Sequence, residues 1–432
     1  MGNEINGLGG CFFSLFSIDD IWMKFVIEFM GNMGLVWPII CFSIRPKQRC
    51  ELVWIMTTEK ITLGIIGAGK FGTALAHRFC DNDHLEVFLG VRKETMLYSK
   101  TSLLDAMLET RTNPKHMPGK KLSDRLIIQS VEEVAQDKDI LIVAVPVGYI
   151  RDAVKTFEAR VAPETIVLST MKGIEFESFK RPTEILREEL ADLPDDRFAV
   201  LSGPTFSSEV YHGHRLSAVI AAHDAGVAET LKKHLSVKDM LNLQTTTDVR
   251  GVEYAGALKN VIAIGAGFLF TKNYGHGPLW AYLNNAAFEM KKMIYLLGGH
   301  HDTIHSQSGI ADLFMTSTSR LSRNWNAGKC LAETGSVSYN NKDGVAEGVY
   351  TSKALKEFFE ANDLVEFASE HFKILFDLGY MIHGNDRSPE EIVEGILSYY
   401  AVELKFNLFQ KAVDRMKLSQ VKRKILRRFE QG

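Results

Sequence analysis

Short apolar runs recur through the first half of the chain and predict a sheet. Their length and near-continuous apolar character are typical of strands in a parallel sheet that is covered on both faces. We expect strands at residues 60–66, 85–90, 139–146, 165–170 and 197–201. From residue 251 onward the pattern is mainly helical. The pattern therefore predicts an α/β domain followed by a helical domain.

The first predicted strand leads directly into a glycine-rich turn and then a helix. Gly67-Ala-Gly69-Lys-Phe-Gly72 follows Ile66, and residues 73–79 are helical in pattern. The glycines permit a tight turn and close backbone approach, and the amino end of the helix accepts a pyrophosphate. A strand, this glycine spacing and a helix, in that order, predict a dinucleotide-binding, Rossmann-like doubly wound sheet. An ordinary glycine-rich connection is the alternative.

The end of the second predicted strand bears on the choice between NAD and NADP. A site selective for NAD usually places Asp or Glu there, where the carboxylate binds the ribose hydroxyls. This chain has no acid at that point and continues with Arg92 and Lys93. The two cations could meet a 2′-phosphate, so the sequence favours NADP, or the use of either cofactor. A pair of solvated charges is the alternative.

Two segments follow the carboxyl ends of predicted strands, where open α/β sheets bind their ligands. Lys172 comes just after the strand at 165–170, so we expect it to touch substrate. The turn at residues 202–209 follows the strand at 197–201. It offers backbone amides and hydroxyl groups.

Residues 251–267 predict a helix with one cation, Lys259, at its centre. Residues three and four positions away share a face with this lysine, and they are small or apolar: Ala255, Gly256, Ile262 and Ala263. Such a face would shelter the amine from water and lower its pKa towards a range useful for proton transfer. The alternative is a lysine at the edge of a core helix whose ammonium reaches solvent.

A further polar block lies between residues 305 and 324. It contains Asp312, hydroxyl groups at 316–319, and the pair Arg323-Asn324 before a helical stretch. A carboxylate, hydroxyl groups and an Arg–Asn pair in this order suit an oxyanion or phosphate site.

Composition narrows the class of protein. A chain of 432 residues is long enough for two or three domains, and 46% apolar with 24% charged residues is ordinary for a soluble enzyme. The net charge of −3 gives no indication of nucleic-acid binding. The five cysteines form no CxxC pair, which argues against a disulfide framework or a zinc site and suits a reducing cytosol.

The two ends of the chain differ from the rest. Residues 25–44 are apolar enough to span a bilayer, but Glu28, glycines and Pro38 interrupt them. We treat residues 1–58 as an N-terminal extension and favour a natural start at Met56, so that the preceding residues are upstream sequence or a poorly ordered extension. A membrane segment is the alternative. Residues 401–432 form a basic tail. A solvated helix is favoured there, and contact with a membrane surface is the alternative.

Several sequence blocks, taken together, resemble one family. The chain from about Thr58 to Tyr400 is similar to NAD(P)-dependent glycerol-3-phosphate dehydrogenases, nearest their bacterial branch. The matching blocks are GAGKFGTALA at Gly67, MPGKKL at Met117, MKGIE at Met171, LSGPTFSSEV at Leu201, GVEYAGALKNVIAIGAG at Gly251, GIADL at Gly309, SRN at Ser322 and GVAEGVYTSKAL at Gly344.

The resemblance implies an organisation and an activity. It implies a Rossmann-like domain at 59–248 and an all-helical substrate domain at 249–400, with substrate in the cleft between them. It implies interconversion of dihydroxyacetone phosphate and sn-glycerol 3-phosphate with NADP or NAD, supplying glycerophospholipid synthesis. It further implies a cytoplasmic homodimer that needs no metal, to which we add possible weak membrane contact through either terminus.

The resemblance also assigns residues to roles by motif. Catalysis falls to Lys259, Lys172 and Asp312. Substrate binding falls to Lys172, Gly203, Thr205, Thr316, Ser322, Arg323 and Asn324. Cofactor binding falls to Gly67, Gly69, Lys70, Phe71, Gly72, Arg92, Lys172, Ser207, Arg323, Val345 and Glu347.

The assigned chemistry is physically consistent. A cationic Lys259 can stabilise negative charge on a carbonyl oxygen and give it a proton. Lys172 adds a second cation, so each lysine would depress the pKa of the other, and Asp312 can offset their repulsion. The guanidinium of Arg323 suits a bidentate grip on phosphate.

Some residues depart from the family pattern. Thr205 replaces the more usual Ser, and Ser207 stands where Ala is common. Residues 274–286 also differ, which puts substrate entry and the subunit interface in doubt. A related dehydrogenase acting on another hydroxy acid and a non-catalytic dinucleotide-binding sensor remain alternatives. The Ser322-Arg323-Asn324 block argues against the first, and joint retention of the two lysines and Asp312 argues against the second.

Overall fold

The computed structural model describes residues 40–41, 52–53, 60–97, 100–337, 340–341, 344–384 and 386–399. The chain divides into two compact units, residues 1–60 and 61–432. In the first unit the described residues form an antiparallel pair, β1 (Ile40–Cys41) and β2 (Leu52–Val53). The rest of the predicted apolar segment at 25–44 and the basic tail at 401–432 lie outside the described residues.

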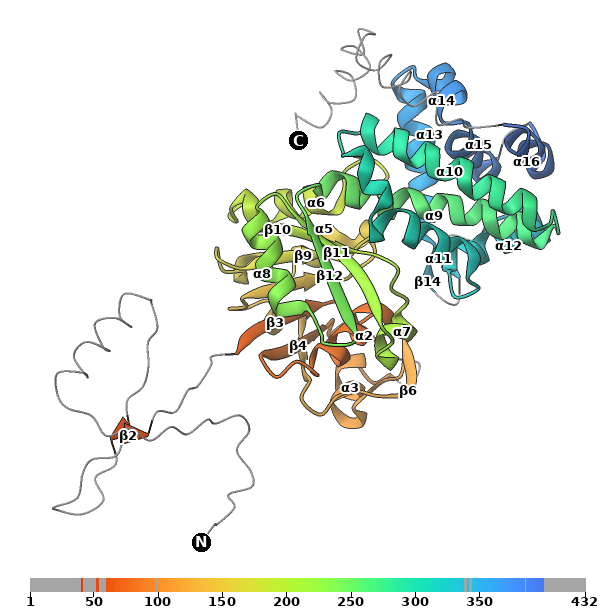
Figure 1. Ribbon diagram of the computed structural model, residues 1–432. Helices are drawn as coiled ribbons and strands as arrows, with labels where there is room; N and C mark the ends of the chain where they lie inside the picture. The colour runs from red at the N-terminus through yellow and green to blue at the C-terminus, as the bar shows by residue number, and fades with distance from the viewer. Residues whose placement is uncertain are drawn as a thin grey trace, which may run out of the picture. The chain divides into compact units, whose positions relative to one another are not determined.

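The second unit is built on an eight-stranded sheet (Figure 1). Its spatial order is β12-β11-β10-β9-β8-β3-β4-β7, and neighbouring strands are parallel except β10 and β11. The strands are β3 (Ile61–Ile66), β4 (Leu85–Val91), β7 (Ile127–Ser130), β8 (Ile140–Val143), β9 (Ile166–Ser169), β10 (Phe198–Ser202), β11 (Leu216–Ala222) and β12 (Leu241–Thr246). The five predicted strands are therefore all present.

The sequence reading missed β7, β11 and β12. β11 is an apolar run that pairs antiparallel with β10, with Ala199 opposite Ala222 and Ser202 opposite Val219. β12 then pairs parallel to β11. The doubly wound, mostly parallel sheet is confirmed, and its last two strands run opposite to the rest.

Helices cover both faces of this sheet (Figure 1). The helices of this domain are α2 (Lys70–Phe79), α3 (Leu103–Thr110), α4 (Val131–Val134), α5 (Ile150–Val154), α6 (Pro182–Glu189), α7 (Ser207–His212) and α8 (Ala225–Leu235). Successive residues of a strand point to opposite faces. In β8, Ile140 and Ile142 pack with α2 and α8, whereas Leu141 and Val143 pack with α4, α5 and α6. A small hairpin of β5 (Thr112–Asn113) and β6 (Met117–Lys121) follows α3.

The remaining elements are almost all helical, as the sequence predicted. They are α9 (Val249–Thr271), α10 (His276–Leu296), α11 (Asp312–Thr318), α12 (Arg323–Thr334), α13 (Glu347–Ala361), α14 (Val365–His371), α15 (Lys373–His383) and α16 (Pro389–Leu397). The short strands β13 (Asn340–Asn341) and β14 (Gly344–Val345) pair before α13.

Helix α9 is the central element of this domain and packs against α10, α11, α12 and α13. Its glycines explain how the neighbours come so close. A Cβ atom on Gly267 would lie 2.0 Å from the backbone oxygen of Trp325, and one on Gly328 would lie 1.8 Å from that of Ile264. Among the described residues α9 alone is long and apolar enough to cross a membrane, but it is mostly buried, as a core helix is.

Candidate active site

Lys259 lies in the middle of α9, with 5% of its surface exposed. Its Nζ donates a hydrogen bond to Asp312 Oδ1 at 2.9 Å and another to Thr316 Oγ1 at 2.6 Å. An ammonium carries three donors, so a third N–H can meet an oxygen atom of a bound molecule. The small and apolar neighbours in sequence predicted a sheltered amine, and the structure buries it.

Burial lowers the pKa of Lys259 to about 8. Removal from water disfavours the charged form and is the largest cause. The attraction of Asp312 opposes this effect, while repulsion from Lys172 and Arg323 adds to it. An amine with a pKa near 8 can both give and take a proton close to neutral pH.

Asp312 bridges the two lysines. Its second oxygen, Oδ2, accepts a hydrogen bond of 2.6 Å from Lys172 Nζ, and the carboxylate is fully buried. Burial alone would raise the pKa of this carboxyl, but Lys172 and Lys259 together hold the pKa below its usual value. The carboxylate is therefore ionised and fixes both ammonium groups, as the sequence reasoning expected.

Two glycines shape the backbone around this cluster. Gly309 lies in a π-helical turn, Gln307–Ala311, directly before Asp312, and a Cβ there would be 2.0 Å from the backbone oxygen of Ile304. Gly203 has φ +157°, and a Cβ there would be 2.8 Å from Ala218 Cα. A larger residue at either position would push the backbone away.

The carbonyl of Gly203 organises the other side of the cluster. It accepts a hydrogen bond of 2.8 Å from Lys172 Nζ and one of 3.2 Å from Thr205 Oγ1. The hydroxyl that Thr205 shares with the more usual Ser is therefore used in the structure.

A row of amides supports Lys172 from behind. Asn260 Nδ2 donates to the backbone oxygen of Lys172 at 3.1 Å, and Asn324 Nδ2 donates to Asn260 Oδ1 at 2.8 Å. Asn324 Oδ1 accepts from the backbone N–H of Gly348 at 2.9 Å. Asn324 thus holds α9, α12 and α13 together. Sequence reasoning did not single out Asn260, although its position directly after Lys259 was a signal.

Ser322 and Arg323 start α12. The Ser322 hydroxyl caps the helix by accepting from the backbone N–H of Trp325 at 3.2 Å, and its own O–H can still donate. The Arg323 side chain is exposed, and its charge acts on both Lys259 and Glu347. Burial raises the pKa of Glu347 to about 7, against the attraction of Arg323 and a hydrogen bond from the backbone N–H of Val147.

The glycine-rich turn between β3 and α2 has the shape that a dinucleotide needs. A Cβ on Gly72 would lie 2.1 Å from the backbone oxygen of Gly67, and Gly67 has φ +115°. Gly69 begins α2 with no side-chain cap, and a Cβ there would meet no atom within 4 Å. The turn is thus tight within and open on its outer side, where the amino end of α2 can accept a pyrophosphate. It lies at the point where the strand order reverses, between β3 and β8.

A buried amide fixes this turn. Asn113 Nδ2 donates to the backbone oxygen of Ala68 and to Thr73 Oγ1, both at 2.9 Å. The sequence reasoning did not find Asn113, because its contacts depend on how the β5–β6 hairpin folds back onto α2.

The other residues assigned to the cofactor lie in several elements. Lys70 is exposed at the start of α2, and Phe71 is partly buried against the core beside it. Arg92 follows β4 and is exposed, and Ser207 is the first residue of α7. The backbone of Val345 belongs to β14. The hydrogen-bonded cluster around Lys259 consists of Lys172, Gly203, Asp312 and Thr316.

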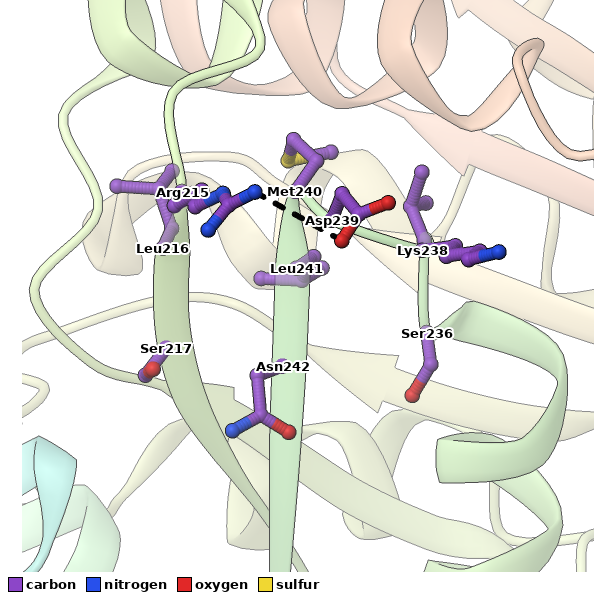
Figure 2. Close-up of a pocket in the computed structure, with 10 residues that line it drawn as sticks. Arg215, Leu216, Ser217, Ser236, Lys238, Asp239, Met240, Leu241 and Asn242 are labelled. Carbon is purple, nitrogen blue, oxygen red and sulfur yellow. Dashed lines mark ion pairs between the residues drawn. The ribbon is translucent and has the colours of Figure 1, made fainter.

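Two other features lie apart from the predicted site residues. A surface hollow is lined by the starts of β11 and β12 and contains an exposed ion pair of 3.9 Å between Arg215 and Asp239 (Figure 2). Among the described residues, His300, His301 and Asp302 form one group whose ligand atoms lie close enough to hold a metal ion. Neither feature includes a residue that the sequence assigned to substrate or cofactor.

A dinucleotide-binding sheet joined to a helical domain, with a buried carboxylate between two lysines, is typical of a nicotinamide-dependent oxidoreductase. Comparisons with known proteins specify the family. Residues 62–228 match the model for the N-terminus of NAD-dependent glycerol-3-phosphate dehydrogenase, and residues 248–394 match the model for its C-terminus.

Sequence relatives agree with this match. Glycerol-3-phosphate dehydrogenase [NAD(P)+] of Teredinibacter turnerae is 34% identical over 304 residues, covering 69% of this chain and 86% of the relative. The protein of the same name from Lysinibacillus sphaericus is 30% identical over 338 residues, covering 77% and 95%. The chain belongs to the NAD(P)-dependent glycerol-3-phosphate dehydrogenase family.

Solved structures show the same fold. Glycerol-3-phosphate dehydrogenase from Coxiella burnetii superimposes with a TM-score of 0.68 at 21% identity, covering 79% of this chain and 99% of that one. The enzyme from Saccharomyces cerevisiae gives a TM-score of 0.65 at 21% identity, covering 79% and 100%.

Proposed function

We propose that this protein is an NAD(P)-dependent glycerol-3-phosphate dehydrogenase. It interconverts dihydroxyacetone phosphate and sn-glycerol 3-phosphate, and so supplies a precursor of glycerophospholipids. The observation that carries the proposal is the buried carboxylate of Asp312 between two ammonium groups, 2.9 Å from Lys259 and 2.6 Å from Lys172.

Lys259 donates the proton during reduction and accepts it during oxidation. A nicotinamide, when bound, would supply the hydride to the carbonyl carbon of dihydroxyacetone phosphate, or accept it from the carbinol carbon of sn-glycerol 3-phosphate. In the reducing direction, negative charge develops on the carbonyl oxygen, and the remaining N–H of Lys259 stabilises that charge and delivers a proton to it. In the oxidising direction the neutral amine takes the proton back. A pKa of about 8 suits both directions.

Lys172 and Asp312 orient the acid and the substrate. Lys172 has donors in use to Gly203 and Asp312, and a further N–H can meet a substrate oxygen. Asp312 keeps the two cations in place. Without a partner, a buried ammonium is strongly destabilising, so the carboxylate also permits the site to exist in the folded state.

We assign the phosphate group of the substrate to Arg323 and Asn324. Arg323 is exposed at the amino end of α12, which itself favours an anion, and its fork of N–H donors matches phosphate oxygens. Asn324 is held by Asn260 and Gly348, so its backbone is fixed beside Arg323. In this proposal the carbonyl group of a short, phosphorylated ketone meets the two lysines and its phosphate group meets Arg323.

The test is a direct assay of purified protein. Dihydroxyacetone phosphate is added with NADH and, separately, with NADPH, and the loss of reduced nicotinamide is followed. Turnover of this substrate supports the proposal. Faster turnover of an unphosphorylated keto acid would favour a hydroxy-acid dehydrogenase, and cofactor binding without turnover of either substrate would favour a sensor.

The setting of the enzyme belongs to the same proposal. We place it in the cytoplasm as a homodimer, with possible weak membrane contact through either terminus. The five cysteines without a CxxC pair support a reducing compartment. Light scattering on the purified chain tests the dimer, and sedimentation with anionic vesicles tests the membrane contact.

A further inference from the structure

The connection between β9 and α6 carries Lys172 and then closes on itself. The backbone N–H of Glu175 donates to the oxygen of Lys180 at 2.9 Å, and that of Phe179 donates to the oxygen of Glu175 at 3.0 Å. Phe179 has φ +60°, which is uncommon for a bulky residue and requires support from its surroundings. The position of Lys172 therefore depends on what holds this loop.

One side of the loop is held by the helical domain. Ile174 and Phe179 are 2% and 4% exposed and belong to the helical core. The ring of Phe179 stacks on that of Phe358, with centroids 4.3 Å apart. This packing fixes the end of the loop nearest α6 and α13.

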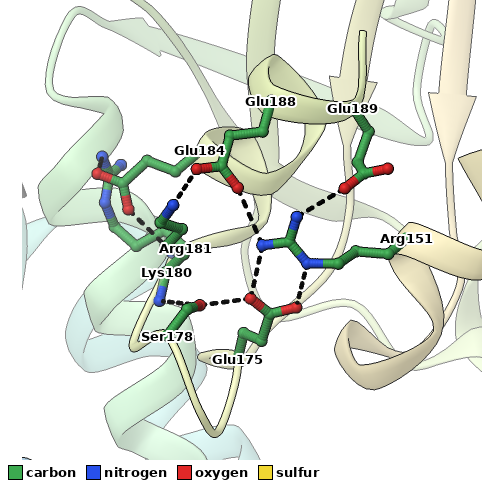
Figure 3. A network of polar contacts seen from close by, with 8 residues as sticks. All are labelled: Arg151, Glu175, Ser178, Lys180, Arg181, Glu184, Glu188 and Glu189. Atoms are coloured by element: carbon green, nitrogen blue, oxygen red, sulfur yellow. Dashed lines mark hydrogen bonds and ion pairs between the residues drawn. The ribbon is translucent and has the colours of Figure 1, made fainter. Parts of the chain in front are cut away.

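On the opposite, polar side the loop is held by Arg151 on α5 (Figure 3). Its Nε and Nη2 donate to the two oxygens of Glu175, both at 2.8 Å. The same guanidinium donates to Glu189 at 2.6 Å and to Glu188 at 2.9 Å, both on α6. Arg151 thus joins the middle of the loop and the carboxyl end of α6 to α5.

The arrangement is stronger than an isolated surface pair, which adds little to stability. The contact of Arg151 with Glu175 is bidentate. The hydroxyl of Ser178 donates to the same carboxylate of Glu175, and Lys180 binds Glu188. Arg151 is about one-third exposed and Glu175 less so. Burial alone would raise the pKa of Glu175, but Arg151 and Ser178 hold the pKa below its usual value.

We propose that Arg151 is a positioning residue that sets the location of Lys172 through Glu175. The inference rests on the proposed function, because Lys172 must meet substrate for its location to matter. Glu175 is three residues from Lys172, whose Nζ makes contacts of 2.6 Å and 2.8 Å that tolerate little displacement. Misplacement of a reacting or binding group by about 1 Å can cost up to about a hundredfold in rate.

A double-mutant cycle tests this role. Wild type, Arg151→Gln, Lys172→Ala and the double variant are compared by kcat/KM for dihydroxyacetone phosphate. We expect Arg151→Gln to lose about tenfold in the presence of Lys172 and to have almost no further effect in its absence. Arg151→Lys, which keeps the charge but not the bidentate contact, should fall between wild type and Arg151→Gln.

A matched control separates positioning from general stability. Arg187→Gln removes another arginine from the same region, where Arg187 binds Asp195 at 2.6 Å. This control should leave kcat/KM within about twofold of wild type. An equal loss from Arg151→Gln with and without Lys172, or no loss at all in an active wild-type background, would overturn the inference. An inactive wild type would instead contradict the proposed function. If Arg151→Gln does not fold, the same comparison is made with Arg151→Lys.

Discussion

Lys259 Nζ lies 2.9 Å from Asp312 Oδ1 where α9 meets the first turn of α11, and neither group reaches bulk water. The contact joins two residues 53 positions apart in sequence. It fixes the ammonium that we assign to proton transfer, and it supplies the counter-charge that lets a lysine lie inside an apolar helix bundle.

Asp312→Asn keeps the size of the side chain and removes its charge. Both lysines lose their counter-ion, so the free energy of unfolding should fall by about 3 kcal/mol in urea denaturation at pH 6. The pKa of Lys259 should also fall further, because the attraction that raises it is gone. Above pH 8 Lys259 is already neutral, so the loss of stability should be smaller there.

Asp377→Asn is a matched control for this variant. Asp377 is a buried carboxylate on α15 that also joins two cations, Lys373 and Arg387. The Asp377→Asn variant should have a lower free energy of unfolding than wild type but an unchanged kcat. Equal kinetic effects of the two variants would mean that Asp312 acts only through folding.

The pH dependence of activity should follow Lys259. Reduction needs the protonated amine, so kcat/KM for dihydroxyacetone phosphate should be full below the pKa of about 8 and fall as pH rises through it. Oxidation of sn-glycerol 3-phosphate needs the neutral amine, so its rate should rise through the same range.

Glu347 provides the competing explanation for such a profile, because its pKa is raised to about 7. Glu347→Gln should leave the step near pH 8 in place. If the step is lost in Glu347→Gln but kept in Lys259→Ala, the group that titrates is Glu347, and our assignment of the step to Lys259 is wrong.

Arg323→Lys tests phosphate recognition. The charge is kept but the planar fork of donors is lost, so KM for dihydroxyacetone phosphate should rise by about tenfold while the fold remains stable. Arg320→Lys, three residues earlier and outside the assigned site, serves as the control. A change in thermal stability without a change in KM would make Arg323 a structural residue.

Cofactor choice should depend on Arg92. No acid closes β4, and Arg92 is exposed directly after it. We expect NADPH to be used at least as well as NADH, and Arg92→Asp to shift the ratio of their kcat/KM values towards NADH by about tenfold. The comparison requires fixed ionic strength, since exposed charges are screened by salt. Wild-type preference for NADH by tenfold or more would contradict this prediction.

The parts of the protein that the sequence predicted well are those whose pattern is local. The turn at Gly67 could be predicted because strand, glycine spacing and helix follow one another along the chain. The helix around Lys259 could be predicted because the residues that share its face lie three and four positions away. The pairing of β11 with β10 was not, because an apolar run such as Leu216–Ala222 does not encode its direction relative to a neighbour.

The supporting residues of the site were missed for a related reason. Asn113 and Asn260 act through hydrogen bonds to Ala68 and Lys172, which are distant in sequence. Nothing in the sequence around Asn113 indicates such a role, and for Asn260 the one indication is its position directly after Lys259. The resemblance of sequence motifs, in contrast, identified Asp312 and Lys172. The fold brings these two residues together as an ion pair between a carboxylate and an ammonium group.

The central claim is that Lys259 donates the proton to the substrate oxygen, and Lys259→Ala tests it most directly. Lys138→Ala is the matched control, since Lys138 is also buried, at 9% exposed, but precedes the amino end of β8, whereas Lys172 follows the carboxyl end of β9. We predict that Lys259→Ala lowers kcat for reduction of dihydroxyacetone phosphate by about a hundredfold or more, with nearly unchanged cofactor binding, whereas Lys138→Ala stays close to wild type. A Lys259→Ala enzyme that retains kcat within a few-fold of wild type would contradict the account.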